Sequence, residues 1–308
     1  MVTPAYSIVV PVYNTEVFTH ELLRRITATM EALGQSYEII CIDDGSPDGA
    51  WNQLTALYNK GTYPLKLIQL TENYGQHKAL LCGLKFATAT QAVILIDADL
   101  QTPPEEIAKL IHAYQTTGTQ VIYGTPKNKQ QPFLRHWGSR FLGKILLRQK
   151  AISPYASSFK LLDVQVVHQL QQAGFEYVFL DAMISWFTHD IGVVEVERAS
   201  RSAGKSGYSL TSLFAMTVQI IIHYTALPLK VMTLGGLLSA VVCFVAGLVF
   251  VIRKLVYDVP LGFTATIVII SFGLSLILAS LGIIGEYMRR LYFLQLRKPQ
   301  FAVKAVKL

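Results

Sequence analysis

Cysteine and charge are both scarce in this sequence. The 308 residues include only three cysteines, Cys41, Cys82 and Cys243, and no two of them have the CxxC spacing of a zinc or redox site. This odd number without ligand spacing also argues against a disulfide framework, and it fits a reducing compartment. Charged residues make up 15% of the chain, against about 25% in an average soluble domain, while hydrophobic residues make up 52%. The composition excludes a disordered chain and argues against a purely soluble protein.

Acidic residues are almost missing from the C-terminal part of the chain. The formal net charge is +7, yet residues 1–228 hold 18 basic and 18 acidic residues. The whole excess therefore lies in residues 229–308, which hold nine basic and two acidic residues. Basic residues beside apolar segments are typical of a membrane surface rather than of a nucleic-acid-binding face. We therefore expect a membrane as a partner, and no nucleic acid.

Two long segments contain no charged residue at all. They are Val231–Ile252, with 22 residues, and Val259–Gly285, with 27. About 20 apolar residues form a helix that is long enough to cross a bilayer. The sequence therefore predicts two transmembrane helices, at about 229–252 and 261–285; the alternative is a buried helical hairpin in a soluble core.

The basic residues around these segments predict their orientation. Residues 253–258, between the two segments, carry one excess positive charge, whereas residues 289–308 carry six basic residues and no acidic one. The positive-inside rule places the more basic side in the cytoplasm. The sequence thus predicts a multi-pass protein of the plasma (inner) membrane, with both termini and the N-terminal domain in the cytoplasm.

The first 208 residues alternate short β-branched runs with longer helical patterns. Strands are expected at 6–12, 37–43, 65–70, 92–97 and 120–124, and helices at about 16–33, 49–59, 75–89 and 104–117. Such alternation predicts an α/β fold with a mostly parallel, Rossmann-like, doubly wound sheet covered on both faces. Ligands of these sheets bind beyond the carboxyl ends of the strands, so functional residues are expected there.

The domain organisation follows from these patterns. We expect a cytoplasmic α/β domain at 1–208, a juxtamembrane amphipathic helix at 209–228, the two transmembrane helices within 229–290 and a basic cytoplasmic tail at 291–308.

Two carboxylates follow the fourth predicted strand. Asp97 and Asp99 stand two residues apart, and alternate residues of an extended chain point to the same side, so both acids can face the crevice. A pair of anions there is costly without a positive charge between them. A divalent cation, Mg²⁺ or Mn²⁺, shared with a nucleotide diphosphate would supply that charge, with Asp97 and Asp99 as its ligands. The alternative is a pair of turn and capping acids.

The second predicted strand also ends in acids, within CIDDGSPDG at 41–49. Ser46, Pro47 and Asp48 fit a turn and a helix cap. Asp43 and Asp44 are better explained as acceptors of hydrogen bonds from a base or a ribose, because acids then end two strands at one edge of the sheet. We therefore assign both to a nucleotide site.

Several segments together resemble the inverting family 2 glycosyltransferases with the GT-A fold. They are PVYN (11–14), DDGSPDG (43–49), NYGQHKALLCG (73–83) and DADLQTPPE (97–105). Three further segments are similar to bacterial polyisoprenyl-phosphate (undecaprenyl-phosphate) glycosyltransferases and to dolichyl-phosphate mannose synthase: SSFKLLD (157–163), RSAGKSGY (201–208) and IGEYMRRLYFLQLRKP (284–299). The resemblance covers nearly the whole chain.

This resemblance implies a reaction and a donor site. It implies metal-dependent transfer of a sugar from a nucleoside diphosphate, UDP above all, to undecaprenyl phosphate at the cytoplasmic membrane face, giving a lipid-linked sugar for the modification of cell-surface glycans. The positions that match the family's nucleotide, metal and diphosphate sites are Pro11, Tyr13, Asp44, Asp97, Ala98, Asp99 and Gln101.

The resemblance also implies roles for the remaining candidates. Arg201 matches a basic residue that reaches the phosphates, and Lys160 stands where the family usually has Arg, which keeps the charge but loses the bidentate fork. Lys205 is a substitute for the lysine that the family has at position 207. Asp163 is a candidate catalytic helper, although a helix cap is the favoured alternative. Ser158 replaces a family acid, and a lipid phosphate, with a second pKa of about 6, needs no strong base.

Two other functions stay open at this stage. A processive membrane polysaccharide synthase of the same fold would carry a glutamine-x-x-arginine-tryptophan segment, and QPFLRHW at 131–137 has the wrong spacing. A non-catalytic membrane scaffold with a nucleotide-binding fold is the other, and the intact DADLQ segment argues against it. Association into a homo-oligomer is also left open.

Overall fold

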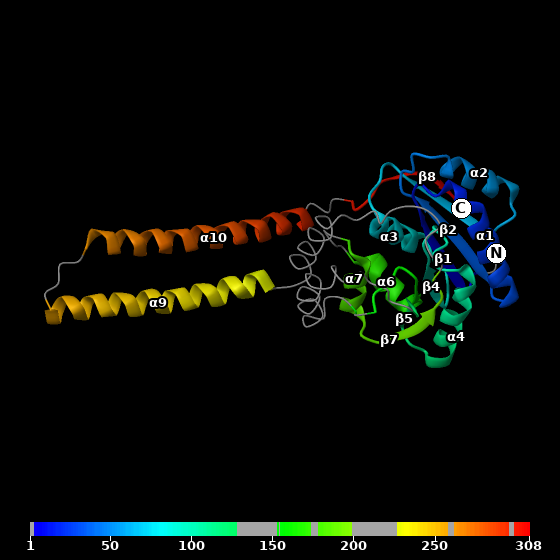
Figure 1. Cartoon of the computed structure of the whole chain (residues 1–308). Helices are drawn as coiled ribbons and strands as arrows, with labels where there is room; N and C mark the ends of the chain where they lie inside the picture. The colour runs from blue at the N-terminus through cyan, green and yellow to red at the C-terminus, as the bar shows by residue number, and fades with distance from the viewer. Residues whose placement is uncertain are drawn as a thin grey trace. The chain divides into compact units, whose positions relative to one another are not determined.

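An eight-stranded sheet with the order β7-β5-β6-β4-β1-β2-β3-β8 lies at the centre of the first of two units of the chain (Figure 1). The first unit is Met1–Leu213 with Pro299–Leu308, and the second is Phe214–Lys298. The computed structural model describes residues 3–127, 153, 155–173, 178–198, 227–257, 262–295 and 299–308.

The central strands of the sheet are parallel. They are β1 (Tyr6–Val12), β2 (Tyr37–Asp43), β3 (Leu65–Leu70) and β4 (Ala92–Leu95). β1 pairs with both β2 and β4, so that Tyr6 lies beside Tyr37 and Ala92, and β2 pairs with β3. Most of their residues are buried, because helices cover both faces of the sheet, and continuous Val and Ile runs are typical of such strands. The predicted α/β fold with a mostly parallel sheet is confirmed.

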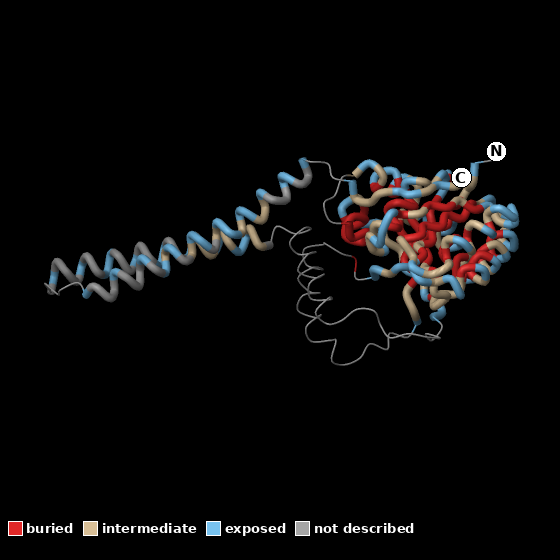
Figure 2. Tube along the Cα trace, turned by 90° about the horizontal axis from the view of Figure 1, so that it is seen from above, coloured by how far each residue is buried: buried red, intermediate tan, exposed pale blue. Residues whose placement is uncertain are grey.

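Helices follow the central strands and supply the rest of the core. They are α1 (Glu16–Ala32), α2 (Ala50–Lys60), α3 (Gln76–Phe86), the short 3-10 helix η1 (Pro104–Glu106) and α4 (Ile107–Thr117). Leu22, Ile26 and Met30 recur at helical spacing along α1 and are buried in the core. Gly61 and Gly118 end α2 and α4 in the left-handed conformation, which a glycine adopts without steric cost. Figure 2 shows the buried segments gathered inside this unit.

The far side of the sheet departs from the parallel pattern. β6 (Lys160–Asp163) runs antiparallel between β4 and β5 (Val121–Pro126), and β7 (Ile191–Val196) pairs in parallel with β5. Two further helices, α6 (Val164–Gln172) and α7 (Leu180–Phe187), belong to this side.

The last residues of the chain form an edge strand. β8 (Val303–Lys307) pairs antiparallel with β3, so the prediction of a tail at 291–308 is corrected for these residues. The sequence VKAVK places lysines among apolar residues, and lysines on an edge strand disfavour pairing with other chains. The lysines made this segment resemble a basic tail in the sequence, although it forms the edge strand of the sheet.

Two long helices make up the described part of the second unit. α9 (Leu227–Tyr257) and α10 (Phe263–Gln295) run side by side in opposite directions and occupy the ranges predicted to span a membrane (Figure 1). Both expose large apolar side chains, among them Leu234, Leu238 and Ile277. Within the described residues no helix combines the length and the apolar character needed to cross a bilayer, which leaves the two predicted transmembrane helices unsupported. The predicted amphipathic helix at 209–228 lies outside the described residues except for its last two, which begin α9.

A buried polar network joins the central strands near their amino ends. Ser7 Oγ donates to Glu38 Oε1 at 2.5 Å, and the backbone N–H and hydroxyl of Thr88 donate to the same oxygen at 2.8 and 3.0 Å. Lys66 Nζ lies 2.6 Å from Glu38 Oε2. Burial by itself would raise the pKa of Glu38, but the ion pair and the hydrogen bonds outweigh it and hold that pKa below its ordinary value.

Glu38→Gln is expected to lower the free energy of unfolding by about 1–3 kcal/mol at neutral pH, because the buried ion pair and its hydrogen bonds are lost. The pKa of Glu38 in the folded chain lies below its ordinary value of 4.5. The carboxylate therefore stabilises the fold above that pH, and the stabilisation is lost as the pH falls through the folded-state pKa. Urea denaturation measures the free energy of unfolding of the unmodified chain and of Glu38→Gln, and the difference between them should shrink on acidification. A difference that stays constant down to about pH 3 would contradict this assignment.

Candidate functional site

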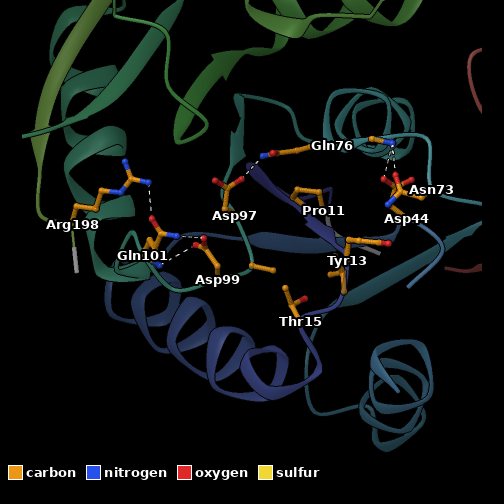
Figure 3. Close-up of a pocket in the computed structure, with 13 residues that line it drawn as sticks. Pro11, Tyr13, Thr15, Asp44, Asn73, Gln76, Asp97, Asp99, Gln101 and Arg198 are labelled. Carbon is orange, nitrogen blue, oxygen red and sulfur yellow. Dashed lines mark hydrogen bonds between the residues drawn. The ribbon is translucent and has the colours of Figure 1, made fainter. Parts of the chain in front are cut away.

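A cleft of about 410 Å³ lies at the carboxyl ends of the central strands (Figure 3). Its walls come from the ends of β1 and β2, from the segments that follow β3 and β4, and from one residue after β7. The lining residues are Pro11, Val12, Tyr13, Thr15, Asp44, Asn73, Gly75, Gln76, Asp97, Ala98, Asp99, Gln101 and Arg198. This is the edge at which ligands of open α/β sheets bind.

Asp97 and Asp99 both line this cleft, and each is held by an amide side chain. Gln76 Nε2 donates to Asp97 Oδ1 at 2.5 Å. The Gln101 backbone N–H donates to Asp99 Oδ1 at 3.1 Å, and Gln101 Nε2 donates to Asp99 Oδ2 at 2.5 Å. Figure 3 shows these two acids apart from Asp44. The cleft thus has one acidic end, formed by the carboxylates of Asp97 and Asp99, and a third acid, Asp44, elsewhere in its wall.

The backbone takes an uncommon conformation directly after two cleft-lining residues. Leu100, directly after Asp99, and Asn14, directly after Tyr13, each have a φ of 55°. Leucine rarely adopts this left-handed conformation, and such residues tend to gather at functional sites, where the surrounding structure holds them. The turn at Leu100 brings the amide of Gln101 back to Asp99.

Burial raises the pKa of Asp97 above its ordinary value. A hydrogen bond from Ser158 and the positive charges of Lys160 and Arg198 oppose this shift, and the nearby negative charge of Asp99 adds to it. A cation that approaches Asp97 stabilises its ionised form, because it offsets both the lost hydration of the carboxylate and the repulsion from Asp99. The electrostatics of the pair therefore favour binding of a positive ion.

The oxygen ligands of the cleft suit a cation that arrives together with a phosphate ligand. Among the described residues, no three His, Cys, Asp or Glu side chains gather into a metal site. Mg²⁺ in nucleotide enzymes is held by one or two carboxylates and by substrate phosphates, and Mn²⁺ also prefers oxygen ligands. Asp97 and Asp99 fit that arrangement.

Asp44 is fixed in the wall of the cleft by the loop after β3. It is only 3% exposed and accepts hydrogen bonds from the backbone N–H groups of Tyr74, at 2.8 Å, and Gly75, at 2.9 Å. Burial raises its pKa. Asp43 has a different role: it accepts hydrogen bonds from Ser46 N at 3.1 Å and Gln69 Nε2 at 3.2 Å, and it does not line the cleft.

Arg198 is the cationic side chain among the cleft-lining residues, and the sequence interpretation missed it. Arg198 Nη2 donates to Gln101 Oε1 at 2.7 Å, so that Gln101 connects it to Asp99. Gln76 and Asn73 were also missed as individual residues, although both lie in the NYGQHKALLCG segment singled out above. Arg198 has no local motif, because β7 brings it to the cleft through tertiary structure.

Lys160 is buried beneath the site and does not line the cleft. It is 1% exposed, and its Nζ donates to Asp181 Oδ1, which also accepts a hydrogen bond from the Tyr123 hydroxyl at 3.0 Å. The Nζ atom lies 5.2 Å from the centroid of the Tyr123 ring. In this structure the charge of Lys160 is therefore directed at Asp181.

Asp163 lies at the opposite end of its strand from Lys160. It pairs with Ala92, the first residue of β4, and its Oδ1 accepts a hydrogen bond from Gln165 N at 2.7 Å at the start of α6. The helix-cap alternative is confirmed. Arg201 and Lys205 lie outside the described residues. The structure thus gathers seven of the predicted residues at the cleft: Pro11, Tyr13, Asp44, Asp97, Ala98, Asp99 and Gln101.

Comparison with known proteins gives a sequence match that spans most of the chain. The family described as "Glycosyl transferase family 2" matches residues 7–171. A relative from Synechocystis sp. (strain PCC 6803), described as the uncharacterized glycosyltransferase sll0501, is 32% identical over 291 residues, which are 93% of this chain and 90% of the relative.

Solved structures with the same fold are more distant in sequence. Glucosyl-3-phosphoglycerate synthase from Mycobacterium tuberculosis, in complex with Mn²⁺, UDP and glucosyl-3-phosphoglycerate, has a TM-score of 0.52 and 18% identity, covering 71% of this chain and 78% of its own. Mannosyltransferase PcManGT from Pyrobaculum calidifontis, in complex with GDP-Man and Mn²⁺, has a TM-score of 0.50 and 17% identity, covering 74% of this chain and 64% of its own. At such identities the likeness shows the fold alone, which is the GT-A fold.

Proposed function

The chain belongs to glycosyl transferase family 2, and from this membership we propose that it transfers a sugar from a nucleoside diphosphate to a polyprenyl phosphate, with inversion at the anomeric carbon. The donor of the proposal is a UDP-sugar, and the acceptor is undecaprenyl phosphate in the cytoplasmic leaflet of the plasma membrane. The observation that carries it is the pair Asp97 and Asp99 in a cleft shared with Tyr13 and Asp44.

The cleft offers separate groups for the two halves of a nucleotide sugar. Tyr13 is 47% exposed and lines the cleft together with Asp44. Asp44 accepts two backbone hydrogen bonds, and a carboxylate has lone pairs for more, so it is able to accept a bond from a base or a ribose. The diphosphate would then lie toward Asp97 and Asp99. The Mn²⁺, UDP and GDP-Man named for solved structures of the same fold support a nucleotide sugar and a cation as ligands of this cleft.

The leaving nucleoside diphosphate needs positive charge beside it. A divalent cation held by Asp97 and Asp99, when bound, supplies most of it as a Lewis acid at the phosphate oxygens. Arg198 contributes a second, fixed charge, because Gln101 holds its guanidinium beside Asp99. Preorganised charges of this kind stabilise the transition state without reorganisation.

The acceptor phosphate attacks the anomeric carbon of the sugar from the face opposite the nucleotide. A bond forms between a phosphate oxygen and that carbon, and the bond from the same carbon to the nucleoside diphosphate breaks, so the product is a polyprenyl-phosphate sugar. A phosphate monoester is largely dianionic at neutral pH, its second pKa being about 6, so the attack needs positioning rather than a strong base. The presence of Ser158, where related enzymes carry an acid, is consistent with this chemistry.

A lipid acceptor is supported by the segments at 157–163, 201–208 and 284–299 and by the second unit. α9 and α10 expose rows of leucine, valine and isoleucine side chains. Large exposed apolar surfaces mark sites of membrane or protein association. We propose that these helices hold the chain at the membrane in which the acceptor resides.

Transfer of labelled sugar from water into an organic phase tests the proposal. The full chain is incubated with radiolabelled UDP- or GDP-sugars, Mg²⁺ or Mn²⁺, and undecaprenyl phosphate in detergent, and label is counted in the organic phase. Label should move there only when the lipid phosphate is present. A long water-soluble polymer would instead favour a processive synthase, and no turnover of any sugar nucleotide would favour a non-catalytic scaffold.

A further inference from the structure

The C-terminal strand β8 pairs with β3 as far as the start of the next loop, which begins at Thr71 and contributes Asn73 and Gly75 to the cleft. Lys307 lies opposite Leu67, and Val303 lies opposite Leu70 at the end of β3. The contact continues one residue further, because the Thr71 N–H donates to the Ala302 carbonyl at 3.0 Å. The chain end therefore lies against the point at which β3 becomes this loop.

Additional contacts hold both ends of the C-terminal segment 299–308. The Tyr58 hydroxyl of α2 donates to the carbonyl of Leu308 at 2.7 Å, and Lys307 Nζ lies 5.7 Å from the centroid of the Tyr58 ring. At the other end, Lys85 Nζ of α3 lies 5.3 Å from the centroid of the Phe301 ring. Cation–π contacts of this kind at exposed sites contribute modestly, so backbone pairing provides most of the docking.

The segment 71–76, which is the loop after β3 with the first residue of α3, contacts both Asp44 and the acidic end at Asp97. Tyr74 and Gly75 give their backbone N–H groups to Asp44, and Gln76 gives its amide to Asp97. The hydroxyl groups of Thr71 and Tyr74 lie 2.9 Å apart within hydrogen-bonding distance. The loop thus begins at the residue that β8 holds and ends at the residue that holds Asp97.

The loop is also packed closely from beneath. Gly45, with a φ of +66°, approaches the backbone of Glu72 so closely that a Cβ atom there would lie 2.7 Å from its carbonyl carbon. Asp44 therefore depends on the exact path of the loop, and a shift of the loop would move its two hydrogen-bond donors together. One anchor of that path is Gly45 and the other is Ala302 of the C-terminal segment.

Resting on the proposed function, we propose that residues 299–308 are a positioning segment for the donor site: by pairing with β3 up to Thr71 they hold the 71–76 loop in the conformation that binds the nucleotide sugar. Without this segment the loop would have more conformations to lose on binding, and this ordering would weaken donor affinity. The position of Asp99 would be affected less, because Gln101, in the turn after β4, holds it independently of the loop.

Removal of the segment tests this role with UDP as the probe. In titration calorimetry with Mn²⁺ present, a chain that ends at Lys298 should bind UDP about tenfold more weakly than the full chain. The KM for the sugar nucleotide should rise by a similar factor while kcat changes little. A synthetic peptide of residues 299–308 should restore the affinity when it is added to the shortened chain, which a merely unstable protein would not show.

Milder variants keep the test valid if truncation impairs folding. Ala305→Pro removes a backbone N–H from the strand and should weaken UDP binding, and Tyr58→Phe, which removes only the bond to Leu308, should do so to a smaller extent. Lys304→Ala, an exposed position on the same strand, is the matched control and should bind as the unmodified chain does. Circular dichroism verifies that each variant is folded.

The failures of the two proposals are distinguishable. If the full chain binds UDP and a folded variant without strand pairing binds it equally well, the positioning role is wrong and the proposed function stands. A peptide that binds the shortened chain without changing its UDP affinity also overturns the positioning role. If the full chain itself binds neither UDP nor GDP, the proposed function fails first.

Discussion

Asp99→Asn is expected to reduce sugar transfer by at least about 10³-fold while the chain stays folded, and Asp97→Asn should do the same. Asparagine keeps the size of the side chain and an oxygen that accepts the Gln101 N–H, but it removes the negative charge that a cation needs. Loss of a single preorganised group that stabilises developing charge costs about 10²–10³ in kcat. Loss of a metal ligand adds to this cost, because the leaving diphosphate is then no longer neutralised. The initial rate of label transfer across a range of Mn²⁺ concentrations measures the effect.

A matched control and a second readout separate metal binding from general damage. Asp190→Asn makes the same change at the loop before β7, where Asp190 accepts a hydrogen bond from Gln120 N at 3.1 Å, and it should transfer sugar at the normal rate. Electron paramagnetic resonance of Mn²⁺ should show the ion bound to the unmodified chain with UDP, and free in Asp99→Asn. Full turnover by either cleft variant, or by the unmodified chain in excess chelator, would show that the carboxylate pair has another role.

The sequence was sufficient to predict the parallel half of the fold and the acidic end of the cleft. Strands with continuous Val and Ile runs, such as Tyr37–Asp43, are found at the predicted residues, because burial on both faces of a parallel sheet requires a pattern that few other structures share. The carboxyl ends of parallel strands meet at one edge of the sheet, so placing the strands also brings Asp44, Asp97 and Asp99 to that edge. These residues line one cleft because topology fixes where each strand ends.

The antiparallel strands could not be predicted in the same way. β6 has four residues and is inserted between β4 and β5 in the reverse direction, so no local pattern distinguishes the end that faces the cleft. This direction places Lys160 opposite Leu95 and Asp163 opposite Ala92. β8 was missed for another reason: its alternation of valine and lysine is weak, and its partner β3 lies more than 200 residues earlier in the chain. Long-range pairing of short strands has little signal in a single sequence.

Two residues of the cleft, Gln76 and Arg198, were missed because nothing in the local sequence marks either of them as part of a site. Gln76 is a neutral amide at the start of α3, and its contact with Asp97 depends on the path of the preceding loop. Arg198 is one of several basic residues near 198–205 in the sequence, and only its position after β7 distinguishes it. Tertiary structure, rather than residue type, gives both residues their place in the cleft.

The second large effect is expected beneath the cleft, at the buried pair of Lys160 and Asp181. Asp181→Ala should lower the free energy of unfolding by about 3–5 kcal/mol, because it leaves a buried ammonium group without its partner. The Tyr123 hydroxyl would lose its acceptor as well. Burial lowers the pKa of nearby His77 to about 4, so that this histidine is neutral near pH 7 and offers no compensating charge. Urea denaturation followed by circular dichroism measures the loss.

Replacing both partners by apolar residues decides whether Lys160 is structural or contacts phosphate. Lys160→Met together with Asp181→Leu removes both charges, and such replacements of a buried ion pair are often neutral or stabilising, so the double variant should recover most of the stability that Asp181→Ala loses. If Lys160 serves only to satisfy Asp181, the double variant should also transfer sugar with a KM for the lipid phosphate close to that of the unmodified chain. A stable double variant whose KM for the lipid rises by about tenfold or more would show instead that the positive charge of Lys160 leaves Asp181 to bind the acceptor phosphate. A structural role of Lys160 and a role in acceptor binding both predict a folded double variant, but only the second predicts a higher KM for the lipid phosphate.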